Sequence, residues 1–216
     1  MDTHTSAALA SAIDVSRHDF EGLSIRYDER VLAPRDWTAE QSHWAAALIR
    51  TAPPGPVLEV CAGAGQIGLL AVRLAPRSLV CVDADPVACE FLRANALAAG
   101  VRVEVREGPM DRVLRDDERF AVVIADPPWV PHGEVDRFPE DPVTAIDGGP
   151  DGLDLIRACL AVIERHLVPA GSAVLQIGPG QGAAVSELVA TYGDLRVVEV
   201  RDLERGGLVR IDRAPV

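Results

Sequence analysis

A short run of four residues, Asp126-Pro127-Pro128-Trp129, combines a carboxylate, two prolines and an indole. Each proline fixes its φ angle and lacks an N–H, so the run is rigid and its carbonyl oxygens remain free acceptors. A planar amino group could donate one hydrogen to the Asp126 carboxylate and the other to the Pro127 carbonyl, with Trp129 covering its flat face. Such a clamp would direct the nitrogen lone pair at an electrophilic group, so positioning would supply the catalysis. The alternative is a rigid turn that only buries the tryptophan.

A second candidate site is the glycine-rich turn that runs from Glu59 through Gly63 to Gly65. Glycine lets a backbone approach a ligand closely because it has no Cβ, and Asp83, at the end of the next predicted strand, is placed to accept hydrogen bonds from ribose hydroxyls. Taken alone the turn is a weak signal, because a nicotinamide-binding fold has the same layout. The Glu59 carboxylate, however, suits a cationic ligand better than a pyrophosphate. The turn therefore favours S-adenosylmethionine over NAD.

Both candidate sites directly follow predicted strands of one alternating pattern. The predicted strands cover residues 57–61, 79–83, 101–105, 121–126, 173–177, 195–200 and 208–211, and an extended pair is expected within 23–32. The predicted helices cover residues 38–49, a segment ending at 74, 86–99 ended by Gly100, 153–167 and 183–192. Such alternation predicts a parallel α/β sheet with helices on both faces. Right-handed crossovers then place the two candidate sites at one edge of the sheet.

The proline-rich break Pro53-Pro54-Gly55-Pro56 divides the chain in two. Residues 1–52 are expected to be an N-terminal tail and a helical lead-in, in which residues 1 to 18 form a loose tail or a weak helix and Thr38 is the N-cap of the first regular helix. Residues 53–216 are expected to form one Rossmann-like domain.

Composition narrows the function further. The formal net charge is −12, which disfavours a general grip on nucleic acid, and all 21 basic side chains are arginine, which excludes chemistry that needs a lysine. Five arginines between 102 and 119 could form a basic strip, but a solvated edge is the preferred interpretation. The four cysteines lie outside any CxxC pair and the five histidines show no ligand spacing, so we expect reduced thiols, a cytoplasmic protein and no metal. No stretch reaches the roughly 20 apolar residues of a membrane helix.

The sequence resembles the class I methyltransferases and, within them, the HemK-like release-factor glutamine methyltransferase family. The resemblance covers residues 20–180 and is most specific in two segments, Asp126 to Pro131 (DPPWVP) and Asp147 to Asp154 (DGGPDGLD). The family has Asn-Pro-Pro-Tyr-Ile-Pro and a nearly identical second segment. The likeness implies a seven-stranded sheet whose last strand is antiparallel, and S-adenosylmethionine as methyl donor. It implies acceptor contacts at Asp126, Pro127 and Trp129, and cofactor contacts at Glu59, Cys61, Gly63, Gly65, Asp83, Ala84, Met110, Asp111 and Asp126.

Three differences from the family bear on the substrate. The family's Asn is Asp126 here, and an ionised carboxylate only accepts hydrogen bonds, which leans toward an amine acceptor. The family's adenine-contacting Asp falls on Pro109, with Asp111 as a substitute. Only the residues before Phe20 stand where the family has a longer helical domain that holds the release factor.

We therefore expect an N-methyltransferase that acts on an amino or amide nitrogen of a small molecule or protein side chain. Methylation of an exocyclic amine in nucleic acid and a non-catalytic partner protein with this fold are the alternatives. For the segment Asp147 to Asp154, a structural role (Asp151 or Gly152 capping the next helix) and a functional role are equally favoured. Neither the methyl acceptor nor the oligomeric state can be read from the residues.

Overall fold

The computed structural model describes residues 14–215, so most of the expected N-terminal tail lies outside the described residues. The described part of that tail is not loose, because β1 (Ser16–Phe20) pairs with β2 (Leu23–Tyr27) in an antiparallel hairpin. The extended pair expected within 23–32 is thus formed seven residues earlier. Phe20, Leu23 and Ile25 are buried in the main core, and this burial stabilises the hairpin against the rest of the molecule.

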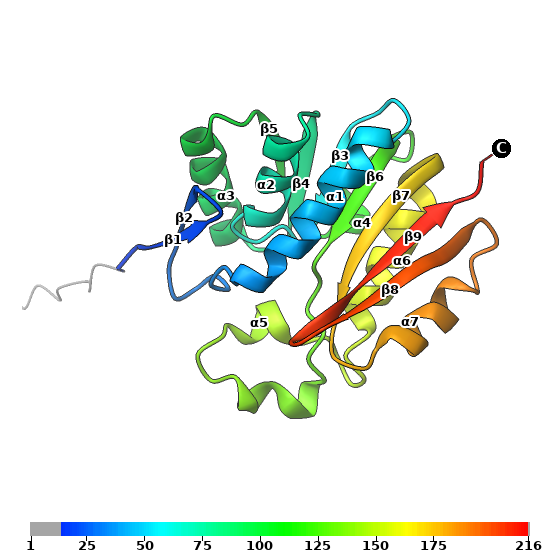
Figure 1. Ribbon diagram of the computed structural model, residues 1–216. Helices are drawn as coiled ribbons and strands as arrows, with labels where there is room; N and C mark the ends of the chain where they lie inside the picture. Colours follow the sequence, from blue (N-terminus) through cyan, green and yellow to red (C-terminus); the bar gives the residue numbers. More distant parts are fainter. Residues whose placement is uncertain (1–13, 216) are drawn as a thin grey trace, which may run out of the picture.

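A seven-stranded sheet forms the centre of the molecule, in the order β5-β4-β3-β6-β7-β9-β8 (Figure 1). Its strands are β3 (Val57–Val60), β4 (Leu79–Asp83), β5 (Val103–Glu107), β6 (Phe120–Ala125), β7 (Leu167–Ile177), β8 (Leu195–Leu203) and β9 (Gly206–Arg213). The pairs β3–β4, β3–β6, β4–β5 and β6–β7 are parallel, and β9 runs antiparallel to both β7 and β8. This arrangement confirms the expected mostly parallel sheet with an antiparallel last strand.

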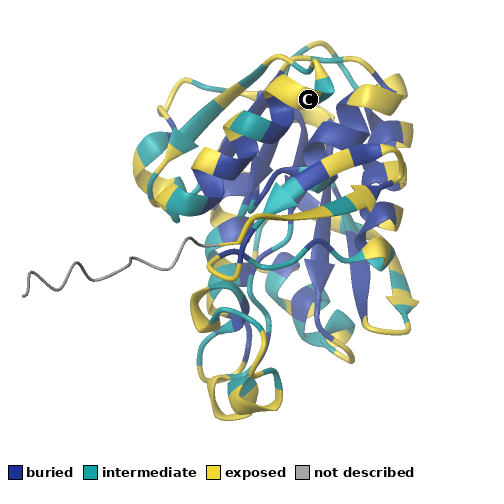
Figure 2. Cartoon of the chain, turned by 90° about the vertical axis from the view of Figure 1, so that its left-hand side faces the viewer, coloured by how far each residue is buried: buried dark blue, intermediate teal, exposed yellow. Residues whose placement is uncertain are grey.

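Helices cover both faces of the sheet, as expected. The helices α1 (Ala39–Thr51), α2 (Gln66–Leu74) and α3 (Pro86–Ala99) pack on one face, and α4 (Met110–Val113), α6 (Asp154–His166) and α7 (Gly182–Val189) pack on the other. The central strands β3 and β6 are buried along their whole length because helices cover them on both sides (Figure 2). Two short helices, η2 (His132–Arg137) and α5 (Val143–Ile146), form a lobe beyond the end of β6.

Local signals in the sequence predicted several helix boundaries. Asp85 caps α3 by accepting a hydrogen bond from the Val87 N–H at 2.8 Å, and Gly100 ends the same helix with a φ of 66°. Thr38 does occupy the N-cap of α1, but its hydroxyl donates to the Arg35 carbonyl and leaves the helical N–H groups alone. Most strand boundaries shifted by one or two residues. The strand β7 starts six residues earlier than expected, because Leu167 pairs with Phe120.

Within residues 14–215, no helix has both the length and the apolar character needed to cross a membrane. The lead-in before Pro53 and the rest of the chain share one hydrophobic core, since Trp44 and Ile49 are buried beside Leu69 and Ile124.

Candidate active site

A cavity of about 920 Å³ lies at the edge of the sheet where β3, β4 and β6 end. Its walls come from the turn after β3, the loop after β4, the turn before α4 and the start of the loop after β6. Of the expected site residues, the structure brings together Cys61, Gly63, Asp83, Ala84, Met110, Asp111 and Asp126 at this cavity. The convergence follows from the parallel sheet, which puts the carboxyl ends of its strands side by side.

The turn after β3 is shaped by residues with positive φ angles. Cys61, Gly63 and Gly65 have φ angles of 55°, 53° and 88°, a region that non-glycine residues rarely adopt. Nothing lies within 4 Å of the place where a Cβ on Gly63 would be, so this glycine faces open space in the cavity. A Cβ on Gly65, by contrast, would lie 2.7 Å from Leu92 Cγ. Gly65 therefore allows close helix packing and does not line the cavity.

Asp83 holds this turn from the neighbouring strand. One carboxylate oxygen accepts a hydrogen bond from the Gly63 N–H at 2.7 Å, and the other accepts from the Asp85 N–H at 2.9 Å. Burial raises the pKa of Asp83, and these two bonds oppose the rise. A carboxylate oxygen has room for a second donor, so Asp83 can both position the turn and accept from a hydroxyl in the cavity.

Glu59 lies behind the turn and does not line the cavity. Its side chain is 2% exposed, one carboxyl oxygen accepts from the Gly68 N–H of α2 at 2.8 Å, and Cys81 Sγ lies 3.2 Å from the other oxygen. A Cβ on Gly68 would lie 2.2 Å from Glu59 Oε2, so the glycine permits this contact. Burial raises the pKa of Glu59 to about 7, partly offset by the bonds from Cys81 and Gly68. The position of Glu59 is that of a buried anchor for the start of α2.

Asp126 stands at the cavity wall directly after β6. No side chain or backbone group of residues 14–215 forms a hydrogen bond with its carboxyl group. Pro128, two residues further along the chain, also lines the cavity. Burial alone raises the pKa of Asp126 to about 7. A half-buried carboxyl group that its own protein leaves unpaired is poised to bind a polar group of a ligand.

Pro127 and Trp129 do not line the cavity. Pro127 is buried, and the ring of Trp129 packs over Gly178 at the end of β7, where a Cβ would lie 2.6 Å from Trp129 Cε3. The alternation of the extended run turns Asp126 and Pro128 one way and Pro127 and Trp129 the other. The contact of Pro127 and Trp129 with a methyl acceptor stays a prediction.

The segment Asp147 to Asp154 supports the run Asp126 to Trp129 from behind. Val130 forms an isolated parallel bridge with Asp147, in which the Val130 N–H donates to Ile146 and the Gly148 N–H donates to Val130. None of these eight residues lines the cavity. The expected cap was wrong, because Leu153, and neither Asp151 nor Gly152, is the N-cap of α6; Asp151 instead accepts a hydrogen bond from the Leu153 N–H at 3.0 Å. These contacts favour the structural role over the functional one.

Two walls of the cavity are formed by residues that no motif in the sequence marks. Val31 and Leu32 line one side from the loop after β2, and Thr144 and Ala145 line another from α5. An ion pair between Arg35 and Asp141, 2.5 Å between nitrogen and oxygen, links the same two segments, which are more than a hundred residues apart. Nothing local marks such residues, because only the fold places them together.

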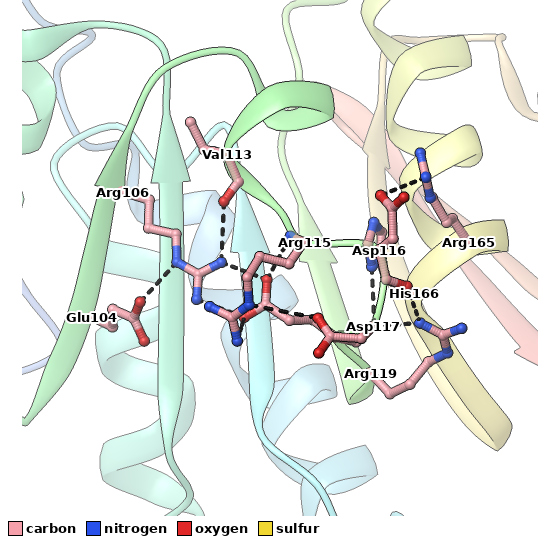
Figure 3. Close-up of polar contacts among 10 residues, drawn as sticks. Glu104, Arg106, Val113, Arg115, Asp116, Asp117, Arg119, Arg165 and His166 are labelled. Atoms are coloured by element: carbon pink, nitrogen blue, oxygen red, sulfur yellow. Dashed lines mark hydrogen bonds and ion pairs between the residues drawn. The ribbon is translucent and has the colours of Figure 1, made fainter.

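Among the described residues, two of the five arginines between 102 and 119 pair with carboxylates. Arg106 pairs with Glu104 at 2.8 Å and with Glu118 at 2.7 Å, and Arg115 lies 3.1 Å from Glu118 (Figure 3). The Arg106 guanidinium lowers the pKa of Glu118 to about 2. Arg119 donates to the Asp116 and Glu118 carbonyls. Paired arginines offer little free charge to a phosphate backbone, which agrees with the interpretation as a solvated edge.

The cavity fits S-adenosylmethionine. Asp83 presents a carboxylate for ribose, and Gln66 has a side-chain oxygen that is buried without a hydrogen-bond partner among the described residues, an acceptor suited to an ammonium group. Ile67, Pro86 and Met110 supply an apolar wall for a purine. Pro109 lines the cavity where the family has an aspartate, and Asp111 lies beside it.

Comparison with known proteins agrees with this geometry. A family described as "Methyltransferase domain" matches residues 57–141. A release factor glutamine methyltransferase of Xylella fastidiosa is 31% identical over 93% of this chain and 75% of its own, and a ribosomal protein uL3 glutamine methyltransferase of Bradyrhizobium diazoefficiens is 32% identical over 77% and 57%. A Thermus thermophilus 16S rRNA methyltransferase solved with AdoMet and guanosine superposes with a TM-score of 0.71 at 18% identity, over 95% of this chain and 52% of its own.

Fold, cavity and relatives together define an S-adenosylmethionine-dependent methyltransferase. The chain belongs to the release factor glutamine methyltransferase family, as the resemblance implied. It spans from 63% to 75% of the length of the first relatives of that name.

Proposed function

We propose that this chain transfers the methyl group of S-adenosylmethionine to the side-chain amide nitrogen of a glutamine in a protein. The relatives named above are glutamine methyltransferases of release factors and of a ribosomal protein. The observation that carries the proposal is the Asp126 carboxyl group, which lies unpaired by the described residues at the wall of the cavity.

The protonation of Asp126 decides which acceptor it suits. An ionised carboxylate only accepts, whereas a protonated carboxyl group donates through its O–H and accepts through its C=O, as an asparagine amide does. Burial raises the pKa of Asp126 to about 7, so a substantial fraction carries the proton near neutral pH. A glutamine carboxamide needs a donor for its carbonyl and an acceptor for its NH2. Protonated Asp126 offers both, which favours an amide over the amine suggested by an ionised aspartate.

The roles of the other residues follow from their places at the cavity. Asp83 and the Gly63 turn hold the ribose and amino-acid part of the cofactor, and the apolar wall around Met110 receives the adenine. When bound, the cofactor supplies an electrophilic methyl group on a sulfonium. Asp126 and the Pro127 carbonyl orient the amide nitrogen toward it, so the chain contributes mainly positioning and exclusion of water.

Mass spectrometry would test this function. Purified protein is incubated with S-adenosylmethionine and, separately, with a bacterial release factor, ribosomal protein uL3 or ribosomal RNA. We expect one methyl group on a glutamine of one of the two proteins. Asp126→Ala should abolish the transfer while binding of S-adenosylhomocysteine, measured by calorimetry, stays nearly unchanged. Methylation of the RNA and of neither protein would replace the proposal with the nucleic-acid alternative.

A further inference from the structure

Gln181, the residue just before α7, joins three separate segments of the chain through its side chain. Its amide NH2 donates to the Trp129 carbonyl and to the Gly152 carbonyl, each at 3.2 Å, and its side-chain oxygen accepts from the Gly178 N–H at 2.7 Å. One carboxamide therefore satisfies two acceptors and one donor, its two N–H hydrogens being shared between two carbonyls. The three segments are the end of β7, the run Asp126 to Trp129, and the loop before α6.

The run Asp126 to Trp129 needs support from outside because its own backbone provides little. Pro127 and Pro128 have no N–H, so they cannot donate a hydrogen bond to another part of the loop. Among the described residues, Gln181 is the only side chain that forms a hydrogen bond with the backbone of residues 127–130. Val130, the residue after Trp129, is held by its own backbone hydrogen bonds with Ile146 and Gly148.

Close packing shows how tightly this junction is built. A Cβ on Gly178 would lie 2.6 Å from the Trp129 ring, and a Cβ on Gly152 would lie 2.4 Å from the Trp129 carbonyl oxygen and 2.8 Å from Gln181 Nε2. Both glycines thus allow the Trp129 backbone and ring to sit against β7 and the loop before α6. Because Pro127 and Pro128 fix their φ angles, the orientation of the Trp129 peptide restricts the conformations open to the run back to Asp126.

We propose that Gln181 is a positioning residue for the methyl acceptor: its side chain fixes the Trp129 carbonyl and so holds Asp126 and Pro128 at the cavity wall. Gln181 itself does not line the cavity, so it acts on the acceptor through the Trp129 backbone. The inference rests on the proposed function insofar as it assigns Asp126 to the acceptor. A misplacement of reacting groups by about an ångström lowers rates by large factors. A residue that acts only through the Trp129 carbonyl can therefore control turnover.

Two substitutions test the contact. In Gln181→Glu the side chain keeps its size and can still accept from Gly178, but its second oxygen faces the Trp129 and Gly152 carbonyls without a hydrogen to donate. In Gln181→Asn the shorter side chain cannot reach all three partners, and this milder change guards against loss of folding. Ser186→Ala is the matched control on α7, because the Ser186 hydroxyl donates only within the helix, to Gly182.

The first measurement, a fluorine spectrum, can be made without a methyl-acceptor substrate. The protein is labelled with 5-fluorotryptophan, which reports Trp37, Trp44 and Trp129, and Trp129→Phe assigns the resonance of interest in the 19F spectrum. We expect the Trp129 resonance to shift or broaden in both Gln181 variants and to stay in place in Ser186→Ala. Unchanged Trp129 resonances in Gln181→Glu and Gln181→Asn would overturn the proposal.

The second readout separates positioning from general damage. With the protein substrate found above, Gln181→Glu should lower kcat and raise the acceptor KM, a loss of kcat/KM of roughly tenfold to hundredfold for two lost hydrogen bonds. The affinity for S-adenosylhomocysteine should remain within about twofold, well under the tenfold that 1.4 kcal/mol represents. A parallel fall of cofactor affinity would contradict a positioning role. If the wild-type protein methylates no protein glutamine, the proposed function fails, and the fluorine spectra still decide the role of Gln181.

Discussion

Glu59 Oε1 accepts a hydrogen bond from the Gly68 N–H at 2.8 Å, which ties the central strand β3 to the first turns of α2 beneath the candidate cofactor cavity. The carboxyl group is almost completely buried, so its charged form is disfavoured. Glu59 therefore supports the cofactor cavity indirectly. Its carboxyl group holds the start of α2 and does not line the cavity.

Stability should fall as pH rises through the range in which Glu59 ionises. Its pKa is raised from the ordinary 4.5 to about 7, so the folded state binds the proton more tightly than the unfolded state does. The resulting stabilisation is fully present below about pH 4.5 and lost as pH rises through about 7, on the order of 3 kcal/mol. Glu59→Gln keeps the acceptor for Gly68 and should flatten this dependence between pH 5 and 8, measured by denaturant unfolding at each pH. An equally steep dependence in Glu59→Gln would contradict it.

Methyl transfer to a glutamine should fall as pH rises above about 7, because Asp126 loses the proton that lets it donate to the amide carbonyl. Asp126→Asn restores the residue that the family carries at this position and cannot ionise. We expect this variant to stay active and to lose the decline, seen in initial rates at saturating cofactor across pH 6 to 8.5. A decline of the same midpoint in both proteins would assign the titration to another group.

Loss of the Asp83 carboxylate should weaken cofactor binding. Asp83→Ala removes the acceptor for the Gly63 and Asp85 N–H groups and the acceptor for ribose. Charge-assisted hydrogen bonds contribute roughly 1.5–3 kcal/mol, so the Kd for S-adenosylhomocysteine should rise by about tenfold to hundredfold. Asp154→Asn is the control, because that exposed carboxylate pairs with Arg157 away from the cavity. Comparable losses in both variants would argue against a specific role for Asp83.

The ion pair between Arg35 and Asp141 should matter for the acceptor more than for the cofactor. It joins the loop after β2 to the segment before α5, and α5 belongs to the loop that follows the run Asp126 to Trp129. Arg35→Gln should raise the acceptor KM by about fivefold, equivalent to roughly 1 kcal/mol, with little change in cofactor Kd. Asp141→Asn should do the same, and the double variant should be no worse than either. Additive effects in the double-mutant cycle would mean that the two residues act independently.

Acid should destabilise the protein partly through Glu118. Its pKa is lowered to about 2, chiefly by the hydrogen bond from Arg106, so its contribution is present above the ordinary value of 4.5 and is lost as pH falls toward 2. Glu118→Gln should melt a few degrees lower at pH 7 and show a smaller loss on acidification, followed by circular dichroism. Glu187→Gln, an exposed position on α7, is the control. Identical acid sensitivity in wild type and Glu118→Gln would exclude this source.

Several features of the protein follow from local sequence alone. The helix Pro86–Ala99 and its end at Gly100 were predicted because a glycine, which adopts the left-handed conformation easily, is a local signal for a helix end. The strand Leu79–Asp83 was predicted because its apolar run is bounded by a loop and a carboxylate. The order of strands and helices predicted the edge on which Asp83 and Asp126 meet, since parallel strands present their carboxyl ends together.

Other features depend on contacts between distant segments and had no local signal. Glu59 was expected at the ligand, but the pleat of β3 turns its side chain toward Gly68 of α2. The approach of Gln181 to Trp129, and of Arg35 to Asp141, joins residues 52 and 106 positions apart. The residue types in the sequence determined the cofactor and the class of reaction. Only the tertiary structure decided which carboxyl group faces the cavity and how far its pKa rises, because burial depends on packing from the whole chain.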